Sequence, residues 1–150
     1  MIVSGEFTVN APREAVFDTI RDPKSFIGLV DGIRDLKEID PTHYEATFET
    51  KIAYLNFKFK VSVEVVNLTI DEIAARIEGT PLGVVGRLTA VTKTTLTDAG
   101  SETRISYSVD AALAGKLGSM GQPVLRSKAK DMEKQFANRL RERFAQTAAE

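Results

Sequence analysis

The feature that most constrains the fold is a long stretch near the C-terminus, residues 115–146, whose apolar side chains recur at steps of three and four. This spacing places one apolar stripe along a helix, with charged side chains on the other side. Such a stripe has to be covered, because most helical stability in proteins comes from packing. Since Pro123 cannot lie inside a helix without breaking a hydrogen bond, we expect a short turn over 116–121 and a main helix from about Pro123 to Gln146. The stripe consists of Leu117, Met120, Val124, Leu125, Ala129, Met132, Phe136, Leu140 and Phe144.

Most of the chain before this helix alternates apolar and polar side chains with a period of two, which is typical of antiparallel strands with one wet face. We expect two short helices between the first strand and the second, the first opened by Pro12 and the second by Pro23. The sequence therefore predicts an α+β fold, with a seven-stranded curved antiparallel sheet around the long C-terminal helix. At this length we expect a single domain, residues 1–150. The predicted strands are residues 2–10, 33–40, 43–54, 57–65, 72–78, 87–96 and 102–113.

Three stretches carry a family resemblance. They are GEFTVNAPREAVFDTIRDPKSF at 5–26, DGI at 31–33 leading into KEIDPTHYEATFETK, and AGKLGSMGQPVLRSKAKDMEKQFANRL at 114–140. The order of elements resembles the helix-grip, or START-like, fold of the birch-pollen-allergen and polyketide-cyclase superfamily. Within it, the chain resembles the G-subunit family of carbon monoxide dehydrogenase along nearly its full length. The chain departs from the family at Asp31-Gly32, where many members have Pro-Gly, and at GTPLGVVG (79–86), where many have a glycine-dense loop.

The resemblance implies a non-enzymatic accessory protein for a molybdenum-containing dehydrogenase. Its implied partners are a hydrophobic small molecule (lipid or quinone-like), a dehydrogenase complex and a peripheral membrane contact, with a role in enzyme recruitment to the membrane or maturation. Many members continue into a membrane-anchoring tail, and since none precedes Glu150 we expect no autonomous anchoring. Two alternatives stay open: a cyclase- or hydrolase-type enzyme of the same superfamily, and a protein-interaction adaptor with a filled core.

The predicted site is the space between the sheet and the long helix, because one helix cannot fill a wide concave face, and such cavities are mostly apolar. Small inward residues, namely Gly5, Ala46, Ala75 and Ala90, favour unfilled room. For each candidate taken singly, packing as ordinary core is the better interpretation. The candidate walls are Phe17, Phe26, Ile27, Val30, Phe48, Tyr54, Phe57, Phe59, Thr92, Thr94, Tyr107, Leu117, Met120, Val124, Leu125 and Met132.

We expect the cavity mouth between residues 26–34, the loop 79–86 and the start of the last helix. All three segments carry glycines, which cost backbone entropy to order, and apolar residues that the alternation leaves without a partner. Those apolar residues are Leu29, Val30, Leu82, Val84, Val85 and Met120.

The chain lacks the residues that several classes of function require. The chain has no Cys and only one His, His43, whose position in the strand alternation places it on the outward face. We therefore expect no catalytic residue, no metal site and no cofactor. Glu45, Glu49 and Glu64 also fall on outward positions, which argues against a paired acid–base site. No phosphate-binding loop is present, and we expect no nucleic-acid binding because the basic surface is one moderate helix face.

Charge is unevenly spread along the chain. Residues 1–115 carry 12 basic and 17 acidic side chains, whereas residues 116–143 carry 8 basic and 3 acidic ones. This pattern predicts a solvated basic helix face opposite an acidic sheet; the alternative is attraction to an anionic membrane or partner. With no signal peptide and no apolar run long enough to span a bilayer, we expect a cytoplasmic protein, at the inner face of the membrane if it is recruited there.

Overall fold

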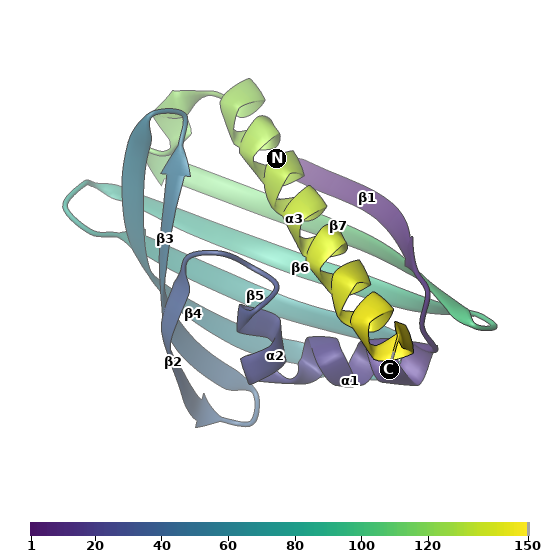
Figure 1. Cartoon of the computed structure of the whole chain (residues 1–150). Coiled ribbons are helices and arrows are strands. Elements are labelled where there is room, and N and C mark those ends of the chain that lie inside the picture. The colour runs from purple at the N-terminus through teal and green to yellow at the C-terminus, as the bar shows by residue number, and fades with distance from the viewer. Residues whose placement is uncertain (150) are drawn as a thin grey trace.

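One curved antiparallel sheet is crossed by a long helix, as Figure 1 shows for this computed structural model, which describes residues 1–149 and the side chains of residues 1–145. The predicted seven-stranded α+β architecture is therefore confirmed. The elements are β1 (Ile2–Val9), α1 (Arg13–Arg21), α2 (Pro23–Ile27), β2 (Ile33–Asp40), β3 (His43–Ile52), β4 (Leu55–Leu68), β5 (Glu72–Pro81), β6 (Gly86–Ala99), β7 (Glu102–Gly115), the 3-10 turn η1 (Gly118–Met120) and α3 (Gln122–Ala149).

The sheet has the strand order β1-β7-β6-β5-β4-β3-β2, so the second strand lies at an edge, as predicted. From β2 to β7 each strand pairs with the next, which makes the connections short hairpins. The turns β2–β3, β4–β5 and β6–β7 consequently lie at one end of the strands. The turn β3–β4, the loop β5–β6 and the entry to α3 lie at the other end.

The hairpin between β3 and β4 turns at Ala53 and Tyr54, two residues before the predicted position at Leu55-Asn56. Ile52 pairs with Leu55 across this two-residue turn, and Ala53 takes a positive φ of 56°. The usual signal for such a turn is Asn-Gly or Gly at the positive-φ position, and Ala-Tyr lacks it. The next loop is also shorter than predicted, residues 82–85, because β5 continues to Pro81 and β6 begins at Gly86.

The apolar core is divided into two clusters at opposite ends of α3. The first cluster lies near α1 and α2 and contains Val9, Ala11, Val16, Ile20, Leu29, Leu96, Ile105 and Leu140. The second lies near the β3–β4 turn and the start of α3 and contains Ile52, Phe57, Phe59, Leu117 and Leu125. The helix is thus packed to the sheet at both of its ends.

Basic side chains of α3 bind the free edge of β1. Arg126 donates to the carbonyl of Ile2 at 2.9 Å, Lys130 to that of Ser4 at 3.1 Å, and Arg141 to that of Thr8 at 3.1 Å. Four helical residues rise about 6 Å and two strand residues about 6.6 Å, so the two periods nearly match.

These three side chains cover an edge strand that would otherwise present unpaired carbonyls. The charge pattern predicted a solvated basic face on this helix. Instead, part of that face is bound to the backbone of β1. No helix within residues 1–149 is long and apolar enough to cross a membrane.

Candidate ligand-binding site

Between the two clusters, the sheet face towards α3 is floored by small side chains. Ala90 lies opposite Ile77 and Ala111 on the neighbouring strands, and Thr92 lies opposite Ala75 and Val109. We call these six residues the middle strip; none of them belongs to either core cluster. Ala75 and Ala90 keep 9% of their surface exposed and the other four are half-buried, although all six point to the covered face. Solvent-accessible surface therefore persists at the centre of that face.

The apolar stripe of α3 has a half-buried stretch between its two packed ends. Ala129 and Met132 in this stretch belong to neither cluster, whereas Leu125 before them and Leu140 after them are core members. A short alanine above a floor of alanines leaves room that larger side chains would fill. The helix is thus held at its ends and spans the strip between them.

A polar pair borders the strip where α3 meets β1. The Tyr107 hydroxyl is buried and has no hydrogen-bond partner among the described residues. A Cβ at Gly5, which lies opposite Tyr107 in the sheet, would sit 2.5 Å from that hydroxyl and 2.5 Å from Glu133 Oε1. The missing side chain at Gly5 is therefore what lets the phenol and the carboxylate lie side by side.

Burial raises the pKa of Tyr107, and the nearby Glu133 carboxylate raises it further, because both disfavour the phenolate. Glu133 itself is mostly buried and also binds Lys130 at 3.2 Å. The outcome is a neutral hydroxyl beside a carboxylate at the border of an otherwise apolar strip. These are groups that could orient a hydroxyl or carbonyl of a bound molecule.

Replacing Glu133 with Gln tests this pair. We expect the pKa of Tyr107 to fall towards its ordinary value without reaching it, because burial is the larger cause of the shift. An alkaline absorbance titration measures this, with Tyr107→Phe identifying the signal among the three tyrosines. Since folding raises this pKa, its stabilising contribution is complete below about pH 10 and is lost as the pH rises further. An unchanged titration in Glu133→Gln would contradict the placement of the carboxylate beside the phenol.

The sequence-predicted site residues fall into separate groups. Thr92, Thr94, Tyr107 and Met132 lie on or beside the middle strip, and the half-buried Ile27 and Val30 lie at and after the end of α2. Two join or pack on the first cluster, namely Phe17 and Phe26. Seven form or pack on the second cluster, namely Phe48, Phe57, Phe59, Leu117, Met120, Val124 and Leu125. Most of the aromatic and aliphatic candidates therefore pack as core at the two ends.

Tyr54 is a correction, because it does not line the interior. Its side chain is 83% exposed. The strand alternation that placed it inward ends at Ile52, and the turn at Ala53 directs the following side chain to solvent.

The predicted mouth is also corrected in part. Leu29 is buried in the first cluster and is not an unpartnered loop residue. The segment before β2 is bound to the second half of α3: Gln135 exchanges two hydrogen bonds with Asp31, and Arg139 pairs with Asp31 at 2.6 Å. The 82–85 loop and the entry to α3 do share one end of the sheet, where the Lys116 N–H donates to the Val85 carbonyl at 2.9 Å.

Sequence reasoning missed Glu133 as an inward carboxylate. Its spacing, four residues after Ala129 and three before Phe136, places it at the margin of the apolar stripe, and that was the available signal. His43 lies on the surface as predicted, where Asp40 at 2.8 Å, followed by Glu64 at 3.1 Å, raises its pKa. No cluster of potential metal ligands occurs within the part of the chain that the structure describes.

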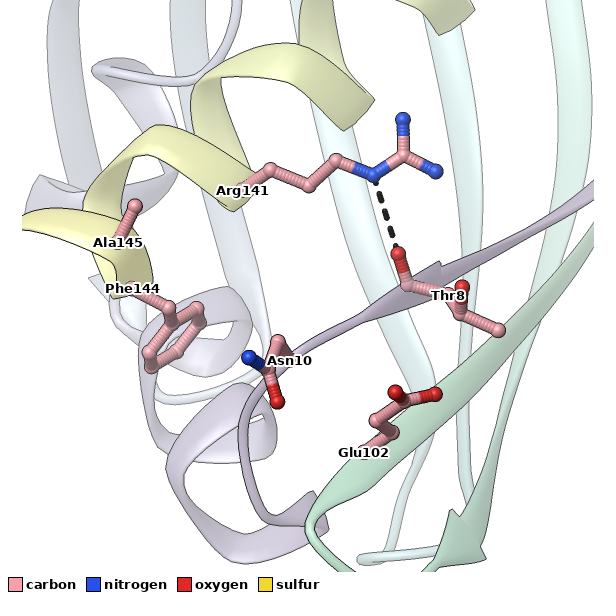
Figure 2. A pocket seen from close by; sticks show the side chains of 6 residues that line it. All are labelled: Thr8, Asn10, Glu102, Arg141, Phe144 and Ala145. Carbon is pink, nitrogen blue, oxygen red and sulfur yellow. Dashed lines mark hydrogen bonds between the residues drawn. The ribbon is translucent and has the colours of Figure 1, made fainter. Parts of the chain in front are cut away.

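Two surface clefts lie outside the middle strip. One, of about 310 Å³, is at the junction of β1 and α3 and is lined by Thr8, Asn10, Glu102, Arg141, Phe144 and Ala145 (Figure 2). Its cation is already engaged, since Arg141 binds the Thr8 carbonyl and lies 5.6 Å from the Phe7 ring centre. The other, of about 550 Å³, lies along the β3–β4 hairpin. Of the predicted cavity walls, only Phe57 lines the second cleft, and none lines the first.

A seven-stranded antiparallel sheet curved around one long helix, with two short helices after the first strand, makes this a START-like α+β protein. A sequence profile for the G-subunit of carbon monoxide dehydrogenase (CoxG) matches residues 5–145. The chain therefore belongs to the CoxG family. No curated protein matches it in sequence.

Solved structures share the fold at low identity. A conserved protein from Geobacillus kaustophilus has a TM-score of 0.89 at 21% identity, covering 98% of this chain and 97% of its own. A START superfamily protein from Mycobacterium smegmatis has a TM-score of 0.73 at 14% identity, covering 97% and 98%. The Zhui aromatase/cyclase from Streptomyces sp. R1128 has a TM-score of 0.71 at 13% identity, covering 95% and 92%.

Proposed function

We propose that this protein binds an apolar small molecule, a lipid or a quinone-like compound, between the middle strip and α3. The observation that carries the proposal is the divided core: both ends of α3 are packed, while the six residues of the middle strip belong to neither cluster and four of them are only half-buried. Transfer of apolar surface from water into such a space is favourable by about 25 cal/mol per Å². The Tyr107–Glu133 pair at the border would orient a polar group of the same molecule.

A binding role without chemistry is supported by the scarcity of reactive groups at the strip. The Thr92 hydroxyl donates to the carbonyl of Ala75 at 3.4 Å, and the neighbouring side chains are aliphatic. One observation favours a second candidate, a cyclase- or hydrolase-type enzyme, namely the inward Glu133 carboxylate beside Tyr107. A general acid or base needs such a titratable group within reach of its substrate.

We further propose that the protein serves a molybdenum-containing dehydrogenase, at the inner face of the membrane. This step is supported by membership of the CoxG family, whose description links it to carbon monoxide dehydrogenase. Delivery of a quinone-like electron carrier, or recruitment of the enzyme to the membrane, fits a domain that binds an apolar molecule.

The direct test is extraction of the purified protein with organic solvent, followed by mass spectrometry of the extract. We expect a lipid or quinone at a substantial fraction of one molecule per chain, together with saturable binding of an added short-chain quinone. Chemical conversion of the bound molecule would favour the enzyme alternative instead. An empty extract combined with no saturable quinone binding would overturn the proposal in favour of a filled-core adaptor.

A further inference from the structure

One end of the molecule carries exposed apolar side chains on two adjacent connections. Tyr54 and Leu55 lie at the β3–β4 turn, and Leu82, Val84 and Val85 lie in the β5–β6 loop, with exposures from 36% for Leu55 to 87% for Val85. We call these five residues the apolar tip. The Leu82 N–H donates to the Lys58 carbonyl at 2.8 Å, which extends the pairing of the loop along the start of β4. In Figure 1 the β5–β6 loop projects beyond the rest of the sheet.

The segments that form the end of the sheet around the apolar tip carry an excess of basic side chains. Residues 51–60, 79–90 and 111–121, which form this end of the sheet, contain no Asp or Glu. Their basic residues are Lys51, Lys58, Lys60, Arg87 and Lys116. Arg87 pairs with Glu78 at 3.0 Å and Lys58 approaches Glu49 at 4.0 Å. Lys51, Lys60 and Lys116 have no ion-pair partner among residues 1–145, whose side chains the structure describes, and their own side chains are exposed.

The opposite end of the sheet has the opposite sign. It also exposes apolar side chains, among them Ile39, Val66, Leu68 and Ile70. Those residues lie among the carboxylates Asp35, Glu38, Asp40, Glu64, Asp71, Glu72, Asp98 and Glu102, which outnumber the basic residues of this end. Asp71, Glu64 and Glu72 are paired with Arg13, Arg76 and Lys93. An anionic surface would attract the tip end and repel this one, because like charges at short range oppose contact.

We infer that the apolar tip docks onto an anionic lipid bilayer, with Tyr54, Leu82, Val84 and Val85 entering the interface and the lysines contacting lipid head groups. Apolar side chains that insert at the interface, together with basic residues that add electrostatic attraction, are the two components of peripheral membrane binding. Docking at this end would place the second core cluster and the entry to α3 next to the bilayer. That this end is also the route for ligand exchange rests on the proposed function, whereas the docking itself requires no ligand.

Vesicle sedimentation tests the inference on the full chain. We expect binding to phosphatidylcholine vesicles that contain phosphatidylglycerol, and little binding to phosphatidylcholine alone. Binding should weaken when salt is raised from about 0.1 M to about 1 M, where the Debye length falls from about 10 Å to about 3 Å. Val85→Asp and Lys116→Glu should each weaken binding by about tenfold. The matched control, Val66→Asp at the opposite end, should leave it unchanged.

Fluorescence reports insertion directly, because the chain has no Trp. We expect the emission of Tyr54→Trp to shift to the blue on anionic vesicles, and that of Ile70→Trp at the opposite end to stay constant. Absence of binding to anionic vesicles, equal losses in Val85→Asp and Val66→Asp, or an unshifted emission at position 54 would each overturn the inference. Val85→Asp should still contain extractable ligand, so a failure of docking is distinguishable from a failure of the ligand proposal.

Discussion

Leu140→Ala is expected to lower the free energy of unfolding by about 2–5 kcal/mol, the range for truncating a fully buried leucine. Leu140 has no exposed surface and belongs to the first cluster with Ile105 and Leu96, each 1% exposed. Its removal leaves a cavity that neighbours on β6, β7 and α1 cannot all collapse to fill. Urea unfolding followed by circular dichroism measures the change, with an unchanged slope confirming that only stability is altered.

Met132→Ala is the matched control on the same helix. Met132 faces the middle strip and belongs to neither cluster, so we expect a loss below about 1 kcal/mol, because few packing contacts are removed. Truncating a methionine in a filled core costs about 2–5 kcal/mol instead. Equal losses for Leu140→Ala and Met132→Ala would therefore mean that the centre is packed, and would favour the adaptor function.

The second large effect is expected on binding. Ala90→Leu adds side-chain volume at the centre of the middle strip, opposite Ile77 and Ala111. If that volume is where the ligand lies, affinity for a short-chain quinone should fall at least about tenfold, or about 1.4 kcal/mol. Stability should change little if the proposed space is there to receive the new side chain, whereas overpacking a filled core costs about 1–3 kcal/mol.

Val91→Leu provides the control for this experiment. Val91 is the next residue of β6, and its side chain is 53% exposed on the outer face of the sheet. We expect neither affinity nor stability to change measurably. Isothermal titration with the quinone and urea unfolding should be run on both variants. A stability loss above about 1 kcal/mol in Ala90→Leu, with quinone affinity retained, would place the ligand elsewhere.

The sequence alone determined the architecture, because periodicity is a local property that packing does not override here. A stripe recurring at three and four residues from Leu117 to Phe144 requires a helix against an apolar surface, and alternation over seven segments provides that surface. The small residues Ala75, Ala90 and Gly5 were recognised as inward for the same reason. The resemblance to the G-subunit family of carbon monoxide dehydrogenase was confirmed by the profile match over residues 5–145.

Only the tertiary structure decided which inward residues face one another and which face open surface. The division of the core into two clusters depends on where a single helix touches a curved sheet, and no periodicity encodes that distance. Glu133 and Tyr107 are 26 positions apart and meet only because Gly5, from the far end of the chain, leaves room between their elements. The predicted inward position of Tyr54 was wrong for a related reason. The turn at Ala53 has a positive φ without a glycine, so no residue type signals that the strand alternation ends there.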